Sequence, residues 1–281
     1  MNGLVLEGGA MRGMFTAGVL DVFLENNIEF DGAVGVSAGA TFGCSFKSKQ
    51  IGRTIRYNVK YCRDKRYCSI RSLLFTGDLF GADFCYRKLP DELDIFDIDT
   101  FNENPMKFYV VCTDIETGKA VYHDMENATR DDCEWYRASA SLPIAARIVE
   151  IDGRKYLDGG MTDSIPIKFM QNEGYDKNVV ILTQPRDYVK GKESMLPIIK
   201  RLYRKYPKLI EALENRHIMY NDTLDYIRSE EKKGNILVIS PESDLKIGHV
   251  EHNADNLKRV YEIGRKTGKK NLEKIKNFLG E

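Results

Sequence analysis

A serine between two glycines, Ser37 in residues 35–39, directly follows the short apolar run at residues 33–34. This pattern predicts a strand, a sharp turn and a helix, the setting that a nucleophile elbow needs. Gly35 and Gly39 permit a strained turn and leave space around the hydroxyl group. At a helix N-terminus, backbone N–H groups would favour negative charge that develops beside the serine. The alternative is a tight turn whose serine only caps the helix.

A second glycine-rich turn, residues 8–13, follows another short apolar strand predicted at residues 4–6. Two such turns at neighbouring strand ends can place a nucleophile beside N–H groups that hold an anion. A phosphate-binding loop is the alternative, but neither nucleotide-binding pattern fits. Met14 and Phe15 stand where a P-loop has Lys and Ser or Thr, and Ala10 replaces the second glycine of the dinucleotide fingerprint.

The base that a serine nucleophile requires is predicted here to be an aspartate. Asp158 ends a predicted strand and is followed by Gly159 and Gly160, which leave room for a substrate. A carboxylate in that place can accept the serine proton directly. An aspartate that only caps its own turn is the alternative. The four histidines lie outside turns of this kind: His123, His217, His249 and His252.

Taken together, the three segments resemble the patatin-like phospholipase family. That family joins a glycine-rich oxyanion loop, a G-x-S-x-G elbow and a later D-G-[GA] motif, which look like residues 7–13, 35–39 and 158–160 here. Residues 138–143 are also similar to the family. The resemblance covers roughly residues 3–170 and is nearest to small bacterial members.

This resemblance implies an α/β fold, namely a three-layer α/β/α sandwich with a mainly parallel central sheet. It also implies hydrolysis of lipid acyl esters by a Ser–Asp dyad without histidine. Carried over to this sequence, Ser37 attacks the ester carbonyl and Asp158 takes its proton. Asp158 would later activate the water that releases the fatty acid.

The resemblance further implies an oxyanion hole at the first turn, with N–H groups supplied by Gly9 and Ala10. Gly8 would shape the turn, and Arg12 would add fixed positive charge. Ala10 departs from the family, which has a third glycine there. Alanine adopts a positive φ only at a cost, so a hole that needs this conformation would be distorted; we expect the methyl group only to narrow it. The remaining motif glycines are expected to keep their turns tight: Gly13, Gly35, Gly39, Gly159 and Gly160.

The order of elements favours the same fold. Strand, helix, strand and helix follow one another over residues 4–46, as in a parallel sheet covered on both faces. We expect one domain over residues 1–281, with a catalytic core at residues 3–170 and strands and helices of residues 171–281 extending it. Further buried strands are predicted at residues 106–113, 179–182 and 236–239.

Three other segments are predicted from charge and aromatic content. Residues 51–66 should form an amphipathic helix with a cationic stripe, and residues 69–94 should be irregular and cover the site. Charged faces are most often simply solvated, but on a lipid hydrolase they would attract anionic head groups. The cationic residues concerned are Arg53, Arg56, Lys60 and Arg63 in the first stripe and Lys200, Arg201, Arg204, Lys205 and Lys208 in a second cluster.

Composition bounds the class of protein. The 281 residues are 42% hydrophobic and 30% charged with zero formal net charge, which fits a folded globular chain and gives no electrostatic case for nucleic acid. No cluster has metal-ligand spacing, so we expect neither metal nor cofactor. No signal peptide and no apolar stretch of about 18 residues is recognised. We therefore expect a cytoplasmic protein, with transient peripheral membrane contact as the alternative, and the sequence favours no oligomeric state.

Three other functions stay open on the sequence. A Ser–His–Asp α/β-hydrolase would use Ser37, Asp158 and then His249 or His252, but only one strand precedes the strand that carries the elbow, whereas that fold has several. An acyltransferase would share the acyl-enzyme step. A catalytically silent lipid-binding module would have lost turnover, for instance through Ala10. The head group and the acyl length are not encoded in any pattern that we recognise.

Overall fold

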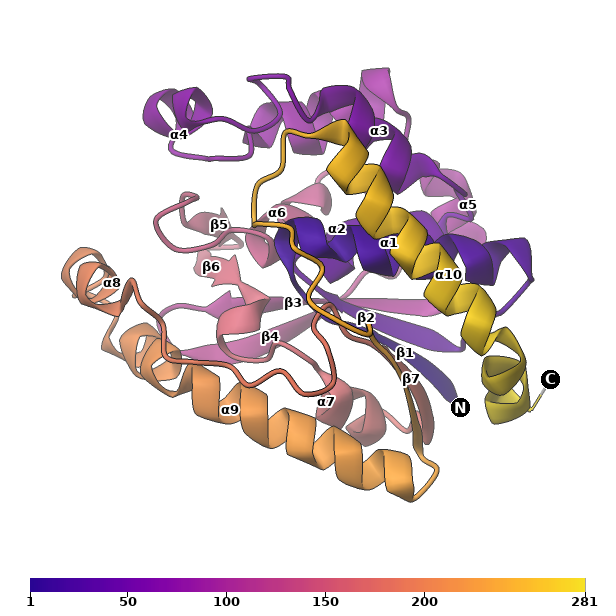
Figure 1. The fold of residues 1–281 in the computed structure, drawn as a ribbon. Helices are drawn as coiled ribbons and strands as arrows, with labels where there is room; N and C mark the ends of the chain where they lie inside the picture. Colours follow the sequence, from indigo (N-terminus) through magenta and orange to yellow (C-terminus); the bar gives the residue numbers. More distant parts are fainter. Residues whose placement is uncertain (281) are drawn as a thin grey trace.

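Alternating strands and helices at the start of the chain build the middle of a central sheet. β1 (Asn2–Leu6) leads through the short 3-10 helix η1 (Ala10–Arg12) into α1 (Gly13–Glu25). β2 (Gly32–Val36) pairs in parallel with β1 and leads through Ser37 into α2 (Ala38–Lys47). The computed structural model describes residues 1–280, and the two strand-to-helix turns lie at the same edge of its sheet (Figure 1).

The sheet is mainly parallel, as predicted. Its strand order is β5-β6-β3-β2-β1-β7-β8, with β4 paired to β3. The five strands from β3 to β8 along this path run parallel, whereas β4, β5 and β6 pair antiparallel at one edge. The remaining bounds are β3 (Lys107–Asp114), β4 (Lys119–Asp124), β5 (Val149–Ile151), β6 (Arg154–Asp158), β7 (Lys177–Ile181) and β8 (Ile236–Ile239).

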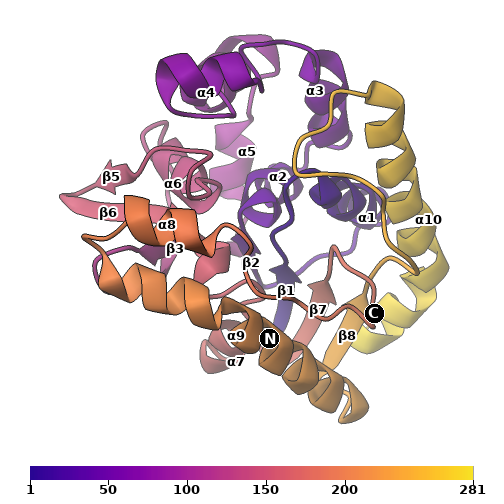
Figure 2. The same ribbon diagram turned by 60° about the vertical axis from the view of Figure 1, so that its left-hand side comes forward.

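Helices cover both faces of this sheet, which makes it the expected three-layer sandwich (Figure 2). Leu4 and Leu6 of β1 pack with α1, α2 and α10 (Ala254–Leu279), whereas Val5 packs with α7 (Ile167–Asn172) and α9 (Pro207–Lys232). Successive side chains of a strand point to opposite faces, so a strand buried on both faces is apolar throughout. This explains why the parallel strands read as unbroken apolar runs.

The first and last helices are in backbone contact. A Cβ atom at Gly18 of α1 would lie 2.1 Å from the carbonyl oxygen of Tyr261, and one at Gly264 of α10 would lie 2.0 Å from that of Phe15. Any residue larger than glycine at either position would push the two helices apart. The pair forms much of one outer layer of the sandwich (Figure 1).

Two predictions about the middle of the chain are wrong. The predicted helix over residues 51–66 is shorter, α3 (Arg53–Tyr61), and Arg53 is buried rather than part of a solvated stripe. The reason is Asp94, whose carboxylate lies 3.6 Å from the Arg53 guanidinium and compensates its charge.

Residues 69–94 are not irregular throughout but contain α4 (Ile70–Thr76) and a π-helix, η2 (Phe84–Leu93). The Ser69 hydroxyl caps α4 by accepting from the Ser72 N–H at 2.9 Å. The remaining helices are α5 (Ile98–Glu103), α6 (Cys133–Ser139), α8 (Leu196–Leu202) and the 3-10 turn η3 (Gly159–Met161). No helix within residues 1–280 is both long and apolar enough to cross a membrane.

Candidate active site

Ser37 lies on a strained turn between β2 and α2. Its backbone has φ 54° and ψ −120°, a left-handed conformation that costs a residue other than glycine about 1–3 kcal/mol. The hydroxyl does not cap α2, since no side-chain bond closes the helix N-terminus. The alternative of a merely capping serine is therefore wrong, and the Ser37 side chain is left free for another role.

The glycines around this turn are required by close contacts. A Cβ atom at Gly35 would lie 2.6 Å from the backbone nitrogen of Ala40, and one at Gly39 would lie 2.4 Å from the carbonyl oxygen of Leu6. Gly13, at the start of α1, faces the first turn of α2 just as closely. The G-x-S-x-G spacing thus lets α2 begin directly against β1 and its turn.

A serine of the 138–143 segment holds the elbow in place. The Ser37 N–H donates to Ser139 Oγ at 2.9 Å, and that hydroxyl donates to the carbonyl oxygen of Val111 at 2.6 Å. Two residues on, the carbonyl oxygen of Ser141 accepts from the Asp158 N–H at 2.9 Å. This segment therefore connects the elbow with the D-G-G turn, a role that its sequence pattern did not reveal.

Asp158 ends β6 and is almost fully buried. Its Oδ1 accepts from the Gly160 N–H at 2.7 Å, whereas Oδ2 is buried and has no partner of regular hydrogen-bond geometry within residues 1–280. Burial raises the pKa of Asp158, and the nearby Ser37 hydroxyl and Arg216 guanidinium act in the opposite direction. Gly159 lets the turn approach β3, because a Cβ atom there would lie 2.2 Å from a β3 carbonyl oxygen.

The first glycine turn lies beside the elbow. Gly8, Gly9 and Ala10 line the same cavity as Ser37 and Asp158. Neither the Gly9 nor the Ala10 N–H takes part in a hydrogen bond to the rest of the described chain. Two unused backbone donors beside a serine can hold a carbonyl oxygen that becomes negative.

Ala10 has a φ of 46°, the left-handed conformation that an alanine adopts only at a cost. The expectation that its methyl group only narrows the hole stays a prediction. The conformation costs an L-residue roughly 1–2 kcal/mol. This backbone strain therefore lies in the glycine-rich turn whose Gly9 and Ala10 N–H groups have no acceptor in the described chain.

Under this turn lies a buried carboxylate to which the sequence analysis assigned no role. Glu7 Oε2 accepts from the Thr183 N–H at 2.5 Å, and Glu7 Oε1 accepts from the Tyr220 hydroxyl at 2.5 Å. Burial raises the pKa of Glu7, and these hydrogen bonds and Arg12 lower it. The Thr183 hydroxyl is also 3.3 Å from the carbonyl oxygen of Gly8, so the network reaches the turn itself.

Helix α9, outside the recognised motifs, supplies further groups. Arg216 donates from Nε to the carbonyl oxygen of Gly160 at 2.6 Å, and Tyr220 one turn later binds Glu7. Lys190 stands over the Tyr220 ring at 5.1 Å from its centroid, and burial together with Arg216 lowers the pKa of Lys190 to about 8. Lys190 lies before α8 rather than on α9. Sequence reasoning missed Arg216 and Tyr220 because a long charged helix gives no sign of which side chains face a site.

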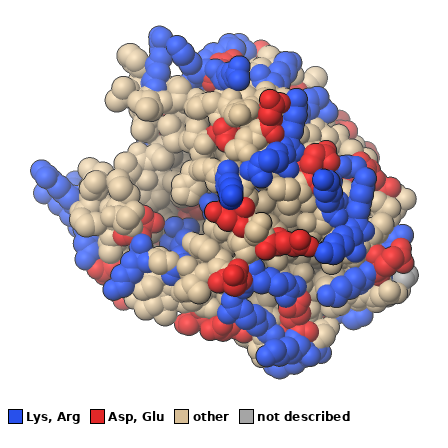
Figure 3. Space-filling view, viewed as in Figure 1, with Lys and Arg blue, Asp and Glu red and all other residues tan. Residues whose placement is uncertain are grey.

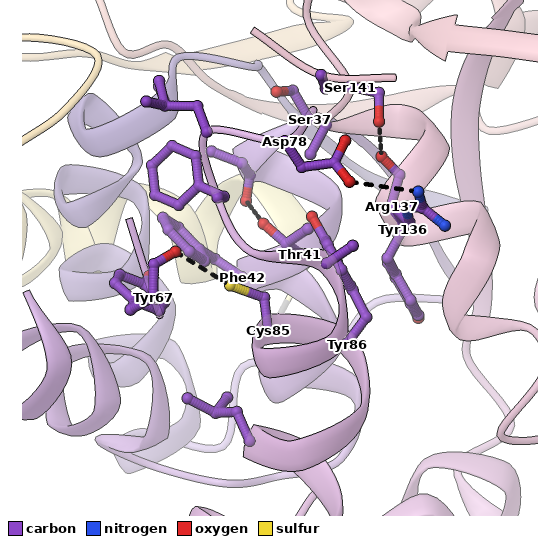
Figure 4. Close-up of a pocket in the computed structure, with 18 of the residues that line it drawn as sticks. Ser37, Thr41, Phe42, Tyr67, Asp78, Cys85, Tyr86, Tyr136, Arg137 and Ser141 are labelled. Atoms are coloured by element: carbon purple, nitrogen blue, oxygen red, sulfur yellow. Dashed lines mark hydrogen bonds and ion pairs between the residues drawn. The ribbon is translucent and has the colours of Figure 1, made fainter. Parts of the chain in front are cut away.

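Two cavities meet at Ser37. One, of about 480 Å³, is lined by Asp158 and by the cationic side chains of Arg12, Lys190 and Arg216. The other, of about 250 Å³, is mainly apolar and aromatic and runs under residues 78–96 (Figure 4). Residues 69–94 help to cover the site, as predicted, because Leu79, Cys85 and Tyr86 line the cavity that Ser37 also lines.

His249 lines both cavities. Burial and the cations around it lower the pKa of His249. Within the described residues, however, no hydrogen bond joins His249 to Ser37 or Asp158. His252 lies elsewhere, with Nδ1 2.5 Å from the carbonyl oxygen of Cys62.

The sequence matches a known protein family over most of its N-terminal part. The model of the family described as patatin-like phospholipase matches residues 4–170, more than half of the chain. The chain belongs to the patatin-like phospholipase family. This membership supports the expected enzyme class, a lipid ester hydrolase. A second model, described as a domain of unknown function (DUF6363), matches residues 206–280, which contain α9 and α10.

Individual relatives are distant. The uncharacterized protein YjjU of Escherichia coli is 27% identical over 99% of this chain and 79% of its own length. Lysophospholipase nte1 of Emericella nidulans is 25% identical over 98% of this chain, which spans only 18% of that much longer protein. The crystal structure of VipD from Legionella pneumophila aligns with 96% of this chain and 67% of VipD at 13% identity and a TM-score of 0.44.

Proposed function

We propose that this patatin-like protein hydrolyses lipid acyl esters with Ser37 as nucleophile and Asp158 as general base. The observation that carries the proposal is the unpartnered, buried Oδ2 of Asp158 on the cavity that the elbow serine also lines. A buried carboxylate oxygen without a regular partner is costly, so an oxygen left in this state beside the Ser37 hydroxyl supports a catalytic use.

The first half of the reaction forms an acyl-enzyme. Ser37 Oγ attacks the ester carbonyl carbon while Asp158 Oδ2 accepts the hydroxyl proton. The carbonyl oxygen becomes negative and is bound by the N–H groups of Gly9 and Ala10. When the tetrahedral intermediate collapses, the ester C–O bond breaks and Asp158 returns the proton to the leaving alcohol.

The second half releases the fatty acid. Water replaces the alcohol, Asp158 accepts one of its protons, and the resulting nucleophile attacks the acyl-enzyme carbonyl. Collapse of this second intermediate breaks the bond to Ser37 Oγ, which regains its proton from Asp158. Burial has already raised the pKa of Asp158, which makes it a stronger base than an exposed aspartate.

The two cavities give the substrate an orientation. We expect the acyl chain in the apolar cavity that Phe42 and Tyr86 line. The leaving-group side would then face Arg12, Lys190 and Arg216, whose charges suit an anionic phosphate head group. Phospholipids and lysophospholipids are accordingly the proposed substrates, in keeping with the lysophospholipase name of one relative.

A serine-reactive fluorophosphonate probe tests the nucleophile. We expect the wild-type protein to be labelled and the Ser37→Ala variant to remain unlabelled, since only the elbow serine has a base and an oxyanion site beside it. Mass spectrometry of a lipid extract after exposure to either protein should then show fatty acid release by the wild type alone. Absence of labelling in correctly folded wild-type protein would contradict the proposal.

The remaining alternative uses histidine as base, and His249 is the residue that its place on both cavities favours. If Asp158 is the base, His249→Gln should keep ester turnover within about threefold. If His249 were the base, its loss would lower turnover by roughly 10²–10⁴-fold, the usual contribution of general-base catalysis. A loss on that larger scale, with the fold intact by circular dichroism, would favour the Ser–His–Asp mechanism instead.

A further inference from the structure

Two helices with solvent-exposed apolar residues border the opening of the larger cavity, which Ser37 and Asp158 line. Leu73 of α4 and Ile199 of α8 line that cavity from opposite sides. Figure 1 shows α4 and α8 as separate projections on one side of the molecule, and Figure 3 shows the surface hollowed between them. We call α4 and α8 the rim helices.

Each rim helix exposes large apolar side chains next to those that face the cavity. On α4, Leu74 is 77% exposed and Phe75 is 81% exposed. On α8, Ile198 is 48% exposed and Leu202 is 60% exposed. Apolar side chains exposed to this degree on two facing projections form a surface that water solvates poorly.

The two segments that carry these side chains are rich in cations, although Arg66 pairs with Asp64, Lys200 with Glu214 and Lys208 with Glu211. Residues 65–77, which include α4, contain three Lys or Arg and no Asp or Glu. Residues 194–208, which include α8, contain five Lys or Arg and no Asp or Glu. The space-filling view shows blue atoms at the outer edges of both projections (Figure 3). Exposed apolar side chains bordered by cations can bind an anionic membrane, whose interior is apolar and whose head groups are negatively charged.

We infer that the rim helices dock the protein on an anionic lipid surface, with Leu74, Phe75, Ile198 and Leu202 inserted and the basic residues against the head groups. Docking in this orientation sets the opening of the catalytic cavity against the lipid. A lipid molecule can then move from the surface into the cavity without its acyl chain crossing bulk water. This inference rests on the proposed function only for the identity of the lipid as a substrate.

The inference gives the basic cluster predicted at residues 200–208 a role in binding head groups. It gives no such role to the cationic stripe on α3. Lys200 and Arg201 belong to α8 itself. Arg56 of α3 pairs with the buried Asp94 at 2.7 Å, whereas Glu214, the partner of Lys200, is 40% exposed. Of the two cationic faces expected from the sequence, the one on α8 adjoins the cavity, which Ile199 lines, and carries two large exposed apolar side chains.

Vesicle sedimentation tests the inference directly. The probe is a vesicle of phosphatidylcholine with about 30% phosphatidylglycerol, and binding should weaken as salt is raised. We expect Leu74→Ser with Phe75→Ser, and separately Ile198→Ser with Leu202→Ser, to lower the vesicle partition coefficient at least tenfold. Ile95→Ser is the matched control: Ile95 is 62% exposed but precedes α5, which lies on the other side of the molecule (Figure 1).

A short water-soluble ester separates this inference from the proposed function. All rim variants should hydrolyse it at the wild-type rate, because none of the four substituted residues lines either cavity. Wild-type binding to vesicles with equal binding by the rim variants would overturn the inference. So would a wild-type protein that hydrolyses the soluble ester but binds no vesicles, or rim variants that only convert a dimer into a monomer. Vesicle binding through the rim without any ester hydrolysis would leave the docking surface standing and refute the proposed function.

Discussion

At the scale of single residues, the site combines strain and uncompensated burial. Ser37 and Ala10 both have left-handed backbones, and Asp158 holds a buried carboxylate oxygen without a partner. Each feature lowers the stability of the fold, and the three meet at one cavity. Costs of this kind are retained where the surrounding structure stabilises them and a function uses them.

Asp158→Asn should strongly reduce turnover and at the same time stabilise the fold near neutral pH. Because burial raises the pKa of Asp158, the native carboxyl group holds its proton more tightly than the unfolded one. Native stability is therefore lost as pH rises from the ordinary aspartate value of 3.8 through the raised native pKa. Asparagine has no charge to bury and avoids this loss, while turnover should fall by at least ~10²-fold.

Thermal unfolding of both proteins across that pH window, together with an ester assay, checks this prediction. The stability difference should vanish on the acid side, where both side chains are neutral. In the wild type, turnover should rise as pH increases through the raised pKa, because the base must be ionised. A variant that keeps near-normal turnover would refute Asp158 as the base.

Ala10→Gly should preserve turnover and change stability by less than about 1 kcal/mol. Glycine adopts the observed φ of 46° without strain, but it also gives the unfolded chain more freedom, and the two effects offset each other. Ala10→Val is the contrasting variant, because a β-branched residue at this φ is strongly disfavoured. We expect it to lower kcat/KM at least tenfold, as measured with a soluble ester alongside urea unfolding. Equal activity of the Val variant would show that the left-handed turn is not needed for turnover.

At the scale of elements, one helix outside the recognised motifs supports both turns of the site. Arg216 of α9 binds the D-G-G turn, and Tyr220 binds Glu7 under the glycine-rich turn. A strand end fixes the position of a turn, but its orientation also depends on what packs behind it. α9 therefore supports the orientation of both turns through Arg216 and Tyr220.

Tyr220→Phe should lower kcat about tenfold with little change in KM. The change leaves Glu7 Oε1 buried without its donor, which costs about 1–3 kcal/mol and loosens the turn that carries the oxyanion donors. The Tyr220 hydroxyl also lowers the pKa of Glu7, so its loss should move the acid limb of the pH–rate profile to higher pH.

Tyr226→Phe is the matched control, because its hydroxyl on the same helix binds Gln171 at 2.6 Å, away from both cavities. It should leave kcat and the pH–rate profile unchanged. Equal effects of the two substitutions would reduce the role of Tyr220 to general stability of α9.

At the scale of the whole molecule, the region after residue 170 completes both the sheet and the site. β7 pairs in parallel with β1 and β8 with β7, so the edge of β1 opposite β2 is covered by strands beyond the family match. The same region provides Lys190 and residues of α9 to the cavity, and its Thr183 binds Glu7. The boundary between catalytic core and extension expected at residue 170 stays a prediction, since one sheet runs across it.

The sequence by itself determined the parts that depend on neighbouring residues. The apolar runs predicted the parallel strands, and the glycine spacings predicted the two turns. Each follows from backbone sterics and side-chain periodicity over a few residues. The family resemblance added the pairing of Ser37 with Asp158, which local pattern alone leaves open.

Only the tertiary structure decided the parts that depend on distant contacts. Whether Arg53 is solvated was decided by Asp94, and whether Ala10 takes a positive φ was decided by the packing of the turn. Glu7 became a buried acceptor through Tyr220, a residue more than two hundred positions away. Burial and electrostatic partners are properties of the packed molecule, so no local pattern can carry them.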